Sequence, residues 1–273
     1  MPNLAKSFDL SGRVAVVTGG AGLLGRQFCA TLAEAGAAVV VADFNGDAAQ
    51  KIAKELKSAR HKAVAQTTDV GEPASVQAMA DAAVREFGHI DILVNSAALD
   101  PKFDKSSQGK NNSAFEDYSL EAWEASLRVN LTGALLCSQA AVRTMLKQDG
   151  GVIVNICSTY GLGGPDQRIY QKQGASPQYK PVDYTVTKAG ILGLTKYLAT
   201  YYGDKNIRVN ALTPGGVFNA HDEQFTKAYS ARTVLGRMAQ PDEMNGALLF
   251  LASDASSYMT GANLVVDGGW TAW

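Results

Sequence analysis

The chain has 273 residues, of which 46% are hydrophobic, so it is long and apolar enough to bury one sizeable core. Its 25 Lys and Arg residues against 26 Asp and Glu residues leave a net charge of −1. Because neither sign of charge predominates, the composition argues against nucleic acid and against anionic membrane surfaces as partners.

The amino-terminal segment MPNLAKSFDLSGR is polar and lacks the apolar core of a signal peptide. No run of 18 apolar residues occurs, so we expect neither export nor a membrane span, but a cytoplasmic protein. The three cysteines are an odd, scattered set that argues against a disulfide framework. The three histidines show no metal-ligand spacing, and we predict no metal site.

Runs rich in Val and Ile alternate with amphipathic stretches of helical length along the whole chain. Strands are expected at 13–18, 37–42, 62–67, 90–94, 151–156, 206–212 and 263–266. Helices are expected at 23–35, 47–58, 74–87, 121–148, 182–202 and 241–252. Largely apolar strands joined by crossover helices run parallel and are covered on both faces. We therefore predict an α/β fold: a doubly wound (Rossmann) parallel sheet of about seven strands, in one domain that spans residues 1–273.

Two polar stretches interrupt this alternation, at residues 96–118 and 159–181. Both are rich in Gly, Pro, Ser and Asn, and both are long for loops without structure of their own. They follow the fourth and fifth strands, at the edge where open α/β sheets bind ligands. We interpret them as substrate loops, with plain surface excursions as the alternative.

A glycine-rich turn joins the first strand to the first helix, reading Thr18-Gly19-Gly20-Ala21-Gly22-Leu23-Leu24-Gly25. Glycines here permit a tight turn and let backbone N–H groups approach a pyrophosphate at the positive end of a helix. We expect dinucleotide contacts from Gly19, Gly22, Leu23 and Leu24.

An acid, Asp43, ends the second strand. A carboxylate at this point accepts hydrogen bonds from the adenosine ribose hydroxyls and repels a 2′-phosphate, which favours NAD over NADP. No Arg or Lys follows in Phe44-Asn45-Gly46, and Phe44 is a further expected contact. The alternative role for Asp43 is a helix N-cap. Asp69 is a candidate for the adenine amino group, and Asn95 for tying its strand end to neighbouring strands; either side chain can equally be structural.

Further motifs follow in order along the chain. They are Asp69-Val70, Asn95-Ser96-Ala97-Ala98, Asn130, Ile153-Val154-Asn155-Ile156-Cys157-Ser158, Tyr184-Thr185-Val186-Thr187-Lys188, Arg208-Val209-Asn210, Pro214-Gly215-Gly216-Val217 and Val266-Asp267-Gly268-Gly269. Together they resemble the short-chain dehydrogenases/reductases in their single-domain form, over nearly the whole chain. The resemblance implies cofactor contacts from Val70, Asn95, Ser96, Ala97, Tyr184, Lys188, Pro214, Gly215 and Val217.

Three features depart from that family pattern. The turn reads TGxxGxxG, a spacing more typical of the extended branch of epimerases and dehydratases. Asn219 replaces the Thr that many relatives have after the Pro-Gly motif. The interval from Ser158 to Tyr184 is 26 positions and so contains an insertion. This insertion and the Trp-rich tail resemble a subgroup linked to bacterial sugar and nonulosonate modification.

Tyr184 and Lys188 lie four residues apart and therefore share one face of a helix. A nearby ammonium lowers the pKa of a phenol toward the range of acid/base catalysis, and Lys188 can also hold the nicotinamide ribose. Ser158 can donate a hydrogen bond to the reacting oxygen and so bind substrate together with Tyr184. By resemblance, Asn130 supports a water that relays protons to Lys188. Cys157 is interpreted as a buried apolar residue.

The sequence thus predicts an NAD-dependent oxidoreductase that moves a hydride between the nicotinamide and a secondary alcohol or ketone. We expect a polar, sugar-like small molecule as substrate, with Arg168 or a loop lysine pairing with its carboxylate or phosphate. Two alternatives remain: an NAD-retaining sugar epimerase or dehydratase, and a non-catalytic NAD-binding regulatory protein. The resemblance also implies a homodimer or homotetramer.

Overall fold

A seven-stranded parallel sheet forms the centre of the computed structural model, which describes residues 4–100, 114–148, 150–171 and 177–273. The strand order is β3-β2-β1-β4-β5-β6-β7. The strands are β1 (Val14–Thr18), β2 (Ala38–Asp43), β3 (Ala63–Thr67), β4 (Ile92–Asn95), β5 (Gly151–Ile156), β6 (Ile207–Pro214) and β7 (Asn263–Val266). The predicted doubly wound fold is confirmed, because the order reverses at β1 and every neighbouring pair is parallel.

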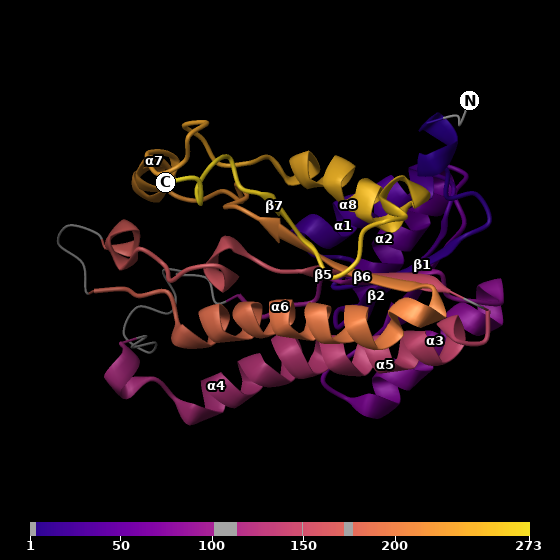
Figure 1. Ribbon diagram of the computed structural model, residues 1–273. Coiled ribbons are helices and arrows are strands. Elements are labelled where there is room, and N and C mark those ends of the chain that lie inside the picture. Colours follow the sequence, from indigo (N-terminus) through magenta and orange to yellow (C-terminus); the bar gives the residue numbers. More distant parts are fainter. Residues whose placement is uncertain (1–3, 101–113, 149, 172–176) are drawn as a thin grey trace.

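Helices cover both faces of this sheet (Figure 1). On one face lie α1 (Leu23–Glu34), α2 (Gly46–Ser58) and α8 (Asn245–Ala252); on the other lie α3 (Pro73–Phe87), α5 (Gly133–Met145) and α6 (Val182–Tyr202). Two shorter helices, α4 (Leu120–Leu127) and α7 (Glu223–Ser230), lie toward the carboxyl edge of the sheet. Single 3-10 turns occur at Leu4–Phe8, Phe115–Asp117, Thr159–Gly161, Gln167–Tyr170, Gly203–Lys205, Pro241–Met244 and Asp254–Ser256.

Two apolar cores, one on each face, hold the layers together. Phe28 and Leu32 of α1 pack with Leu248 of α8 on the first face, all without solvent exposure. Met79 of α3 and Met145 of α5 do the same on the second face. Full burial of one such side chain contributes about 1.5–3 kcal/mol, so both faces stabilise the sheet that positions the site.

The helix expected at 121–148 differs from the one observed. It begins at Leu120, passes through a π-helical segment at Arg128–Thr132 and ends at Met145. The stretch expected at 241–252 starts as a 3-10 turn and becomes α8 only at Asn245. The helix α7 was not predicted, because it is short and polar; its start is marked by Asp222, whose carboxylate accepts from the Phe225 N–H at 2.9 Å.

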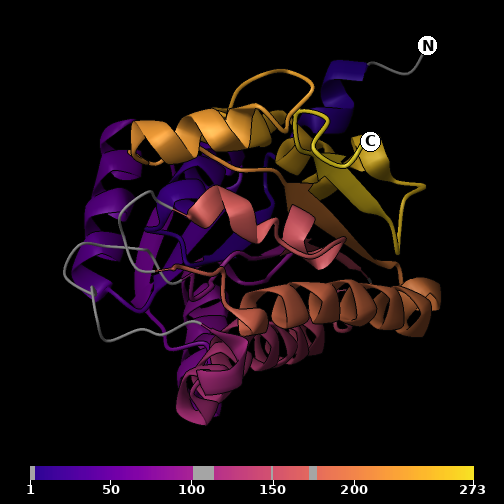
Figure 2. The same cartoon turned by 90° about the vertical axis from the view of Figure 1, so that its left-hand side faces the viewer.

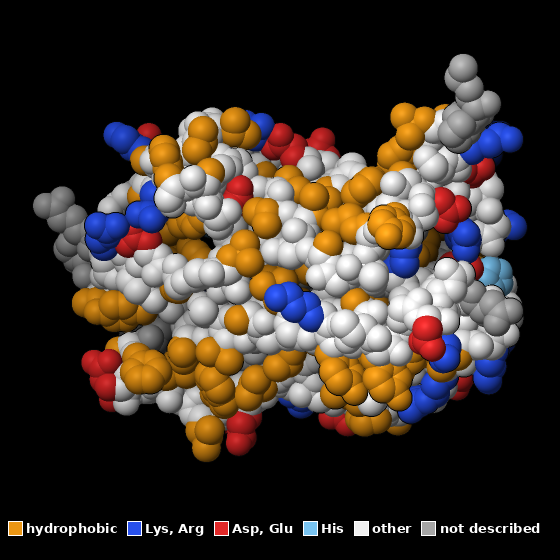
Figure 3. Space-filling model, viewed as in Figure 1, with side chains coloured by type: hydrophobic (Ala, Val, Ile, Leu, Met, Phe, Trp, Pro, Cys, Tyr) orange, Lys and Arg blue, Asp and Glu red, His pale blue; other side chains and the backbone are white. Residues whose placement is uncertain are grey.

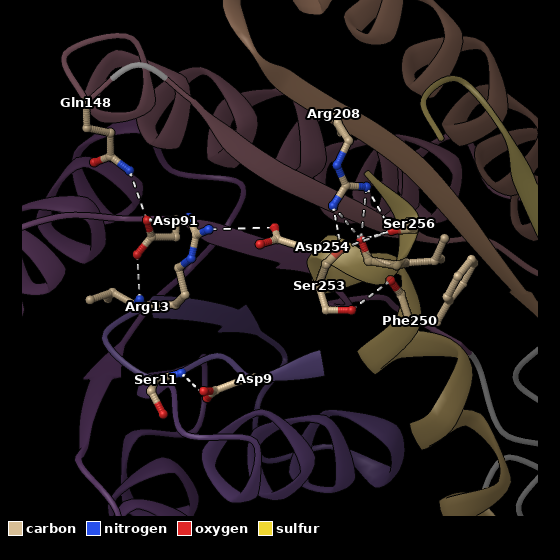
Figure 4. A network of polar contacts seen from close by, with 12 residues as sticks. Asp9, Ser11, Arg13, Asp91, Gln148, Arg208, Phe250, Ser253, Asp254 and Ser256 are labelled. Carbon is tan, nitrogen blue, oxygen red and sulfur yellow. Dashed lines mark hydrogen bonds and ion pairs between the residues drawn. The ribbon is translucent and has the colours of Figure 1, made fainter. Parts of the chain in front are cut away.

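A polar network closes the amino-terminal edge of the sheet, opposite the expected site (Figure 4). The Asp91 carboxylate accepts from the Val14 N–H at 2.7 Å and pairs with Arg13 at 3.4 Å. Arg208 donates to the Ser253 carbonyl and the Ser256 hydroxyl, both at 2.9 Å. These bonds tie the start of β1 to that of β4, and the start of β6 to the turn that follows α8. They therefore stabilise this edge of the sheet.

The three cysteines, Cys29, Cys137 and Cys157, are free and buried. Cys157 packs with Ala134, Ile191 and Ala211, and burial raises the pKa of its thiol, so its interpretation as an apolar core residue is confirmed.

In the described part of the chain, no helix combines the length and the apolarity that crossing a membrane requires.

The first helix approaches the first strand so closely that Gly25 has no room for a side chain. A Cβ there would lie 2.0 Å from the Gly19 carbonyl oxygen. We expect Gly25→Ala to lower the free energy of unfolding by about 2–3 kcal/mol, because α1 must move off the turn. Gly246→Ala is the matched control: Gly246 lies in α8 with open space around it, and the change should add about 0.5–1 kcal/mol. Urea denaturation of both variants measures the difference, and equal stability would contradict the packing.

Candidate active site

The glycine-rich turn lies at the carboxyl edge of the sheet, onto which Figure 2 looks. Gly19 has a φ of +64°, and a Cβ on it would come within 2.8 Å of the Ala97 Cα. Gly22 precedes α1 as its N-cap, and no side chain caps that helix. Leu23 and Leu24 form its first turn, half-buried. The turn therefore presents backbone N–H groups and the positive end of a twelve-residue helix, which fits a pyrophosphate.

Asp43 stands beside this turn at the end of β2. Its two carboxylate oxygens accept from the Ala21 N–H and the Asn45 N–H, each at 2.9 Å. The N-cap of α2 is Asn45, which rules out the helix-cap role considered for Asp43. Phe44 is exposed next to it. A carboxylate held in this way still has lone pairs for ribose hydroxyls.

The next expected contacts line the same edge. The Thr18 hydroxyl accepts from the N–H groups of Ser96 and Ala97 at 3.1 and 3.3 Å, which holds the start of the loop after β4 against β1. Asp69 pairs with Arg128 at 3.2 Å. Val70 is buried against the start of α5. A Cβ on Gly133 would lie 2.7 Å from the Val70 side chain, so the glycine lets α5 pack closely against Val70.

Asn95 ties strand ends together, as predicted. Its side-chain amide donates to the Asn155 oxygen of β5 at 2.8 Å and to the Ser138 hydroxyl of α5 at 3.1 Å. Farther along the edge, β6 ends at Pro214, and the Gly215 N–H donates to the Val266 carbonyl at 2.9 Å. Val217 forms an isolated bridge with Ala239.

Ser158, Tyr184 and Lys188 meet where β5 ends beside α6. The Ser158 hydroxyl accepts from the Tyr160 N–H at 3.2 Å, and its hydrogen bonding to the phenol acts to lower the pKa of Tyr184. Lys188 is buried; its ammonium lies 5.7 Å from the Tyr184 ring centre and donates to the Ile156 carbonyl at 2.9 Å. A serine, a phenol and an ammonium thus share one spot.

Burial dominates the electrostatics of this group. It raises the pKa of Tyr184, the charge of Asp100 raises it further, and the hydrogen bond from Ser158 lowers it. Burial also lowers the pKa of Lys188. The sequence led us to expect a lowered pKa for Tyr184, but in the polypeptide alone this pKa is raised, because desolvation of the phenolate is the largest influence on it.

Asn130 lies in the π-helical segment, a feature often associated with functional positions. Its side-chain amide accepts from the Leu99 N–H at 2.6 Å and donates to the Leu99 carbonyl at 3.0 Å. It also donates to the Thr187 hydroxyl of α6 at 3.3 Å. The side chain thus holds the loop after β4 against α6, and its part in a proton relay stays a prediction.

Arg168 lies on the outside of the insertion. Its side chain is 83% exposed, and its guanidinium binds both oxygens of Asp166 at 2.8 Å. Asp166 also pairs with Arg232, so this carboxylate has two cationic partners. Of the other loop lysines considered from sequence, Lys102, Lys105, Lys110 and Lys172 lie outside the described residues.

Sequence reasoning missed an aromatic cluster over the Tyr184 ring. Tyr160 meets that ring edge-on with ring centres 6.5 Å apart, and its hydroxyl lies 2.8 Å from the Tyr170 hydroxyl. Trp270 of the tail stacks on Tyr229 at 4.2 Å and contacts Tyr160. The many aromatic residues in the insertion and the tail were a signal for this wall. Lys180 and Asp100 were also missed as a pair: they form an ion pair beside Tyr184.

Comparison with known proteins decides the family. A family profile described as enoyl-(acyl carrier protein) reductase matches residues 20–271. D-threitol dehydrogenase of Mycolicibacterium smegmatis is 37% identical over 97% of this chain and 95% of its own. The chain belongs to the short-chain dehydrogenase/reductase family.

Other family members are similar to the same extent. Cis-4-hydroxycyclohexanecarboxylate dehydrogenase of Sinomonas cyclohexanicum is 37% identical, over 95% of this chain and 97% of its own. A gluconate 5-dehydrogenase from Burkholderia cenocepacia, solved with NADP and tartrate, superposes with a TM-score of 0.85 at 33% identity. That match covers 99% of this chain and all of the other. The chain is accordingly an oxidoreductase of a family whose relatives here are named for alcohols; the nonulosonate subgroup stays a prediction.

Proposed function

We propose that this protein is an NAD-dependent dehydrogenase of secondary alcohols, with Tyr184 as the acid/base. The observation that carries the proposal is the contact of the Tyr184 phenol with the Ser158 hydroxyl, beside the Lys188 ammonium and at the sheet edge that bears the glycine turn. Serine and tyrosine hydroxyls at one point can hold a single substrate oxygen.

The residues divide the chemistry among them. NAD, when bound, accepts the hydride from the alcohol carbon. Tyr184 takes the hydroxyl proton, and Ser158 donates a hydrogen bond to the same oxygen, which orients it. The Lys188 ammonium has three donors, of which one meets Ile156, so it can also bind ribose hydroxyls and favour the phenolate. Asn130 holds the backbone of Leu99, in the segment that follows β4, beside this site.

Hydride transfer with net turnover accounts for this site better than the two alternatives. The relatives described above are named dehydrogenases, which supports turnover of the nicotinamide over an NAD-retaining epimerase or dehydratase. A purely regulatory NAD-binding protein has no need for a half-buried phenol beside a serine hydroxyl and a buried lysine. The names of the relatives described above, which include a sugar alcohol and two hydroxy acids, support a polar hydroxylated substrate.

Removal of the phenol tests the mechanism. Tyr184→Phe should lower kcat by about 100- to 10,000-fold, because the alcohol loses its base, while NAD still binds. Tyr258→Phe serves as the control, since Tyr258 is fully exposed. NADH formation with a panel of polyols, cyclic alcohols and sugar acids is the measurement. A Tyr184→Phe variant with wild-type kcat would contradict the proposal.

We further propose NAD rather than NADP as the cofactor, on the position of Asp43. Its carboxylate lies against the glycine turn, where a 2′-phosphate would bring a second negative charge. Neighbouring Phe44 and Asn45 provide no cation for such a phosphate.

Asp43→Asn should therefore raise kcat/KM for NADP about tenfold and lower it for NAD, since repulsion disappears and an acceptor is weakened. Asp47→Asn is the control, because Asp47 is an exposed acid in the first turn of α2. The ratio of kcat/KM for the two nucleotides is the readout; a wild-type preference for NADP would refute the assignment.

Copies of the chain are proposed to associate through helices α4 to α6. Exposed apolar side chains gather on this face, among them Leu120, Leu135, Val186, Tyr197 and Tyr201 (Figure 3). Light scattering should give two or four times the 28.8 kDa of one chain, and Tyr201→Glu should lower that mass. A monomer in the wild type would contradict this.

A further inference from the structure

Lys180 is a buried lysine in the wall of the site, and the family motifs do not include it. It lies two residues before α6 and is 8% exposed, although lysine is among the side chains least often buried. Its ammonium lies 4.1 Å from the centre of the Tyr184 ring, closer than that of Lys188 at 5.7 Å. A second cation therefore faces the reacting phenol.

The backbone around Lys180 is held in place. The side-chain amide of Gln167 accepts from the Lys180 N–H at 2.8 Å and donates to its carbonyl at 3.0 Å. Gln167 belongs to the 3-10 turn that also contributes Tyr170 to the aromatic cluster. The insertion thus fixes the position of the Lys180 backbone beside Tyr184.

The counterion of Lys180 is Asp100, which comes from the other loop. Their ion pair joins a 9% exposed lysine side chain to a 54% exposed carboxylate. After burial, the charge of Asp100 is the largest cause that raises the pKa of Tyr184. A carboxylate thus already occupies the space beside the phenol, where a substrate must come.

The rest of the wall offers little to compete for an anion. Tyr160, Tyr170 and Trp270 make it aromatic. Among the described residues of the insertion, Arg168 is bound by Asp166 and is turned to solvent. Lys188 donates to the Ile156 carbonyl, and Arg232, whose guanidinium lies 5.1 Å from the Trp270 ring centre, pairs with Asp166. Lys180 is therefore the cation of this largely aromatic wall that is placed to orient a ligand by its charged end.

We propose that Lys180 binds a carboxylate of the substrate in place of Asp100, so that the substrate is a secondary hydroxy acid. This rests on the proposed function, because it assigns the substrate class of the same site. One carboxylate replaces another, so the buried ammonium stays paired throughout. The displaced Asp100 is half-exposed and regains water at little cost. A neutral alcohol cannot make this exchange and leaves Asp100 beside the phenol.

Matched pairs of substrates test the assignment. Each pair has one carbon skeleton, with and without a carboxylate: cis-4-hydroxycyclohexanecarboxylate against cyclohexanol, and threonate against threitol. The wild type should prefer the acid. Lys180→Gln should lower the ratio of kcat/KM for the acid to kcat/KM for the matched neutral alcohol at least tenfold, because only the acid loses an ion pair with the substrate. Lys54→Gln, on the exposed face of α2, loses the same charge elsewhere and should not change this ratio.

Asp100→Asn provides a second variant that keeps Lys180, whose ammonium can still donate to the amide oxygen of the new side chain. It removes the competing carboxylate, so KM for the acid should fall at least threefold. Thermal melting and NAD binding, followed by protein fluorescence, show whether Lys180→Gln is folded. If it is not, the Asp100→Asn result decides by itself, and an unchanged or higher KM for the acid overturns the proposal.

Other outcomes also overturn it. An equal loss for acids and neutral alcohols in Lys180→Gln, with a displaced pH profile, would make Lys180 a residue that tunes Tyr184. Loss of acid preference in Arg168→Gln instead would move the anion site to the surface of the insertion. A wild type that oxidises only neutral alcohols would remove the anion site altogether. None of these outcomes contradicts the proposed dehydrogenase function, which would be contradicted only if no alcohol yielded NADH.

Discussion

A row of buried hydrogen bonds crosses the carboxyl edge of the sheet, and the geometry of the site depends on it. Thr18, Asn95 and Asn155 lie side by side on β1, β4 and β5. Asn95 donates to Asn155, and Asn155 donates to the Thr195 hydroxyl of α6 at 2.9 Å. Because buried amides without partners cost about 1–3 kcal/mol each, this row tolerates little displacement. It fixes α6, with its tyrosine and lysine, relative to the end of β5.

That rigidity lets the site combine charges that water would otherwise screen. The ammonium groups of two buried lysines, Lys180 and Lys188, lie 4.1 and 5.7 Å from the centre of the Tyr184 ring, and the carboxylate of Asp100 is nearby. Burial disfavours the phenolate of Tyr184 and the charged form of Lys188. The balance among these terms therefore changes with whatever binds, since each new charge acts in a medium of low polarity. Substrate and cofactor are then part of the electrostatics of the acid/base.

Different parts of the molecule were predictable to different degrees. The strands from β1 to β7 follow from apolar runs, and α6 begins and ends where its pattern predicts. The break of 121–148 at the π-helical segment was not foreseen, because it reflects the fit of Asn130 against the Leu99 backbone. The short helix α7 was not predicted because it has only eight residues, most of them polar. The pKa of Tyr184 was misjudged because spacing on a helix says nothing of burial.

Local order along the chain is enough to specify the sheet, the glycine turn and the serine, tyrosine and lysine of the site. Hydrophobic period, glycine at a crowded turn and a four-residue spacing on a helix are all properties of neighbouring residues. The pairing of Lys180 with Asp100 is of another kind, since the two are 80 positions apart and come from different loops. Only packing of those loops over Tyr184 brings them together. Short stretches of sequence thus indicate the type of reaction, whereas the environment that selects a substrate arises from contacts between residues that are far apart in the sequence.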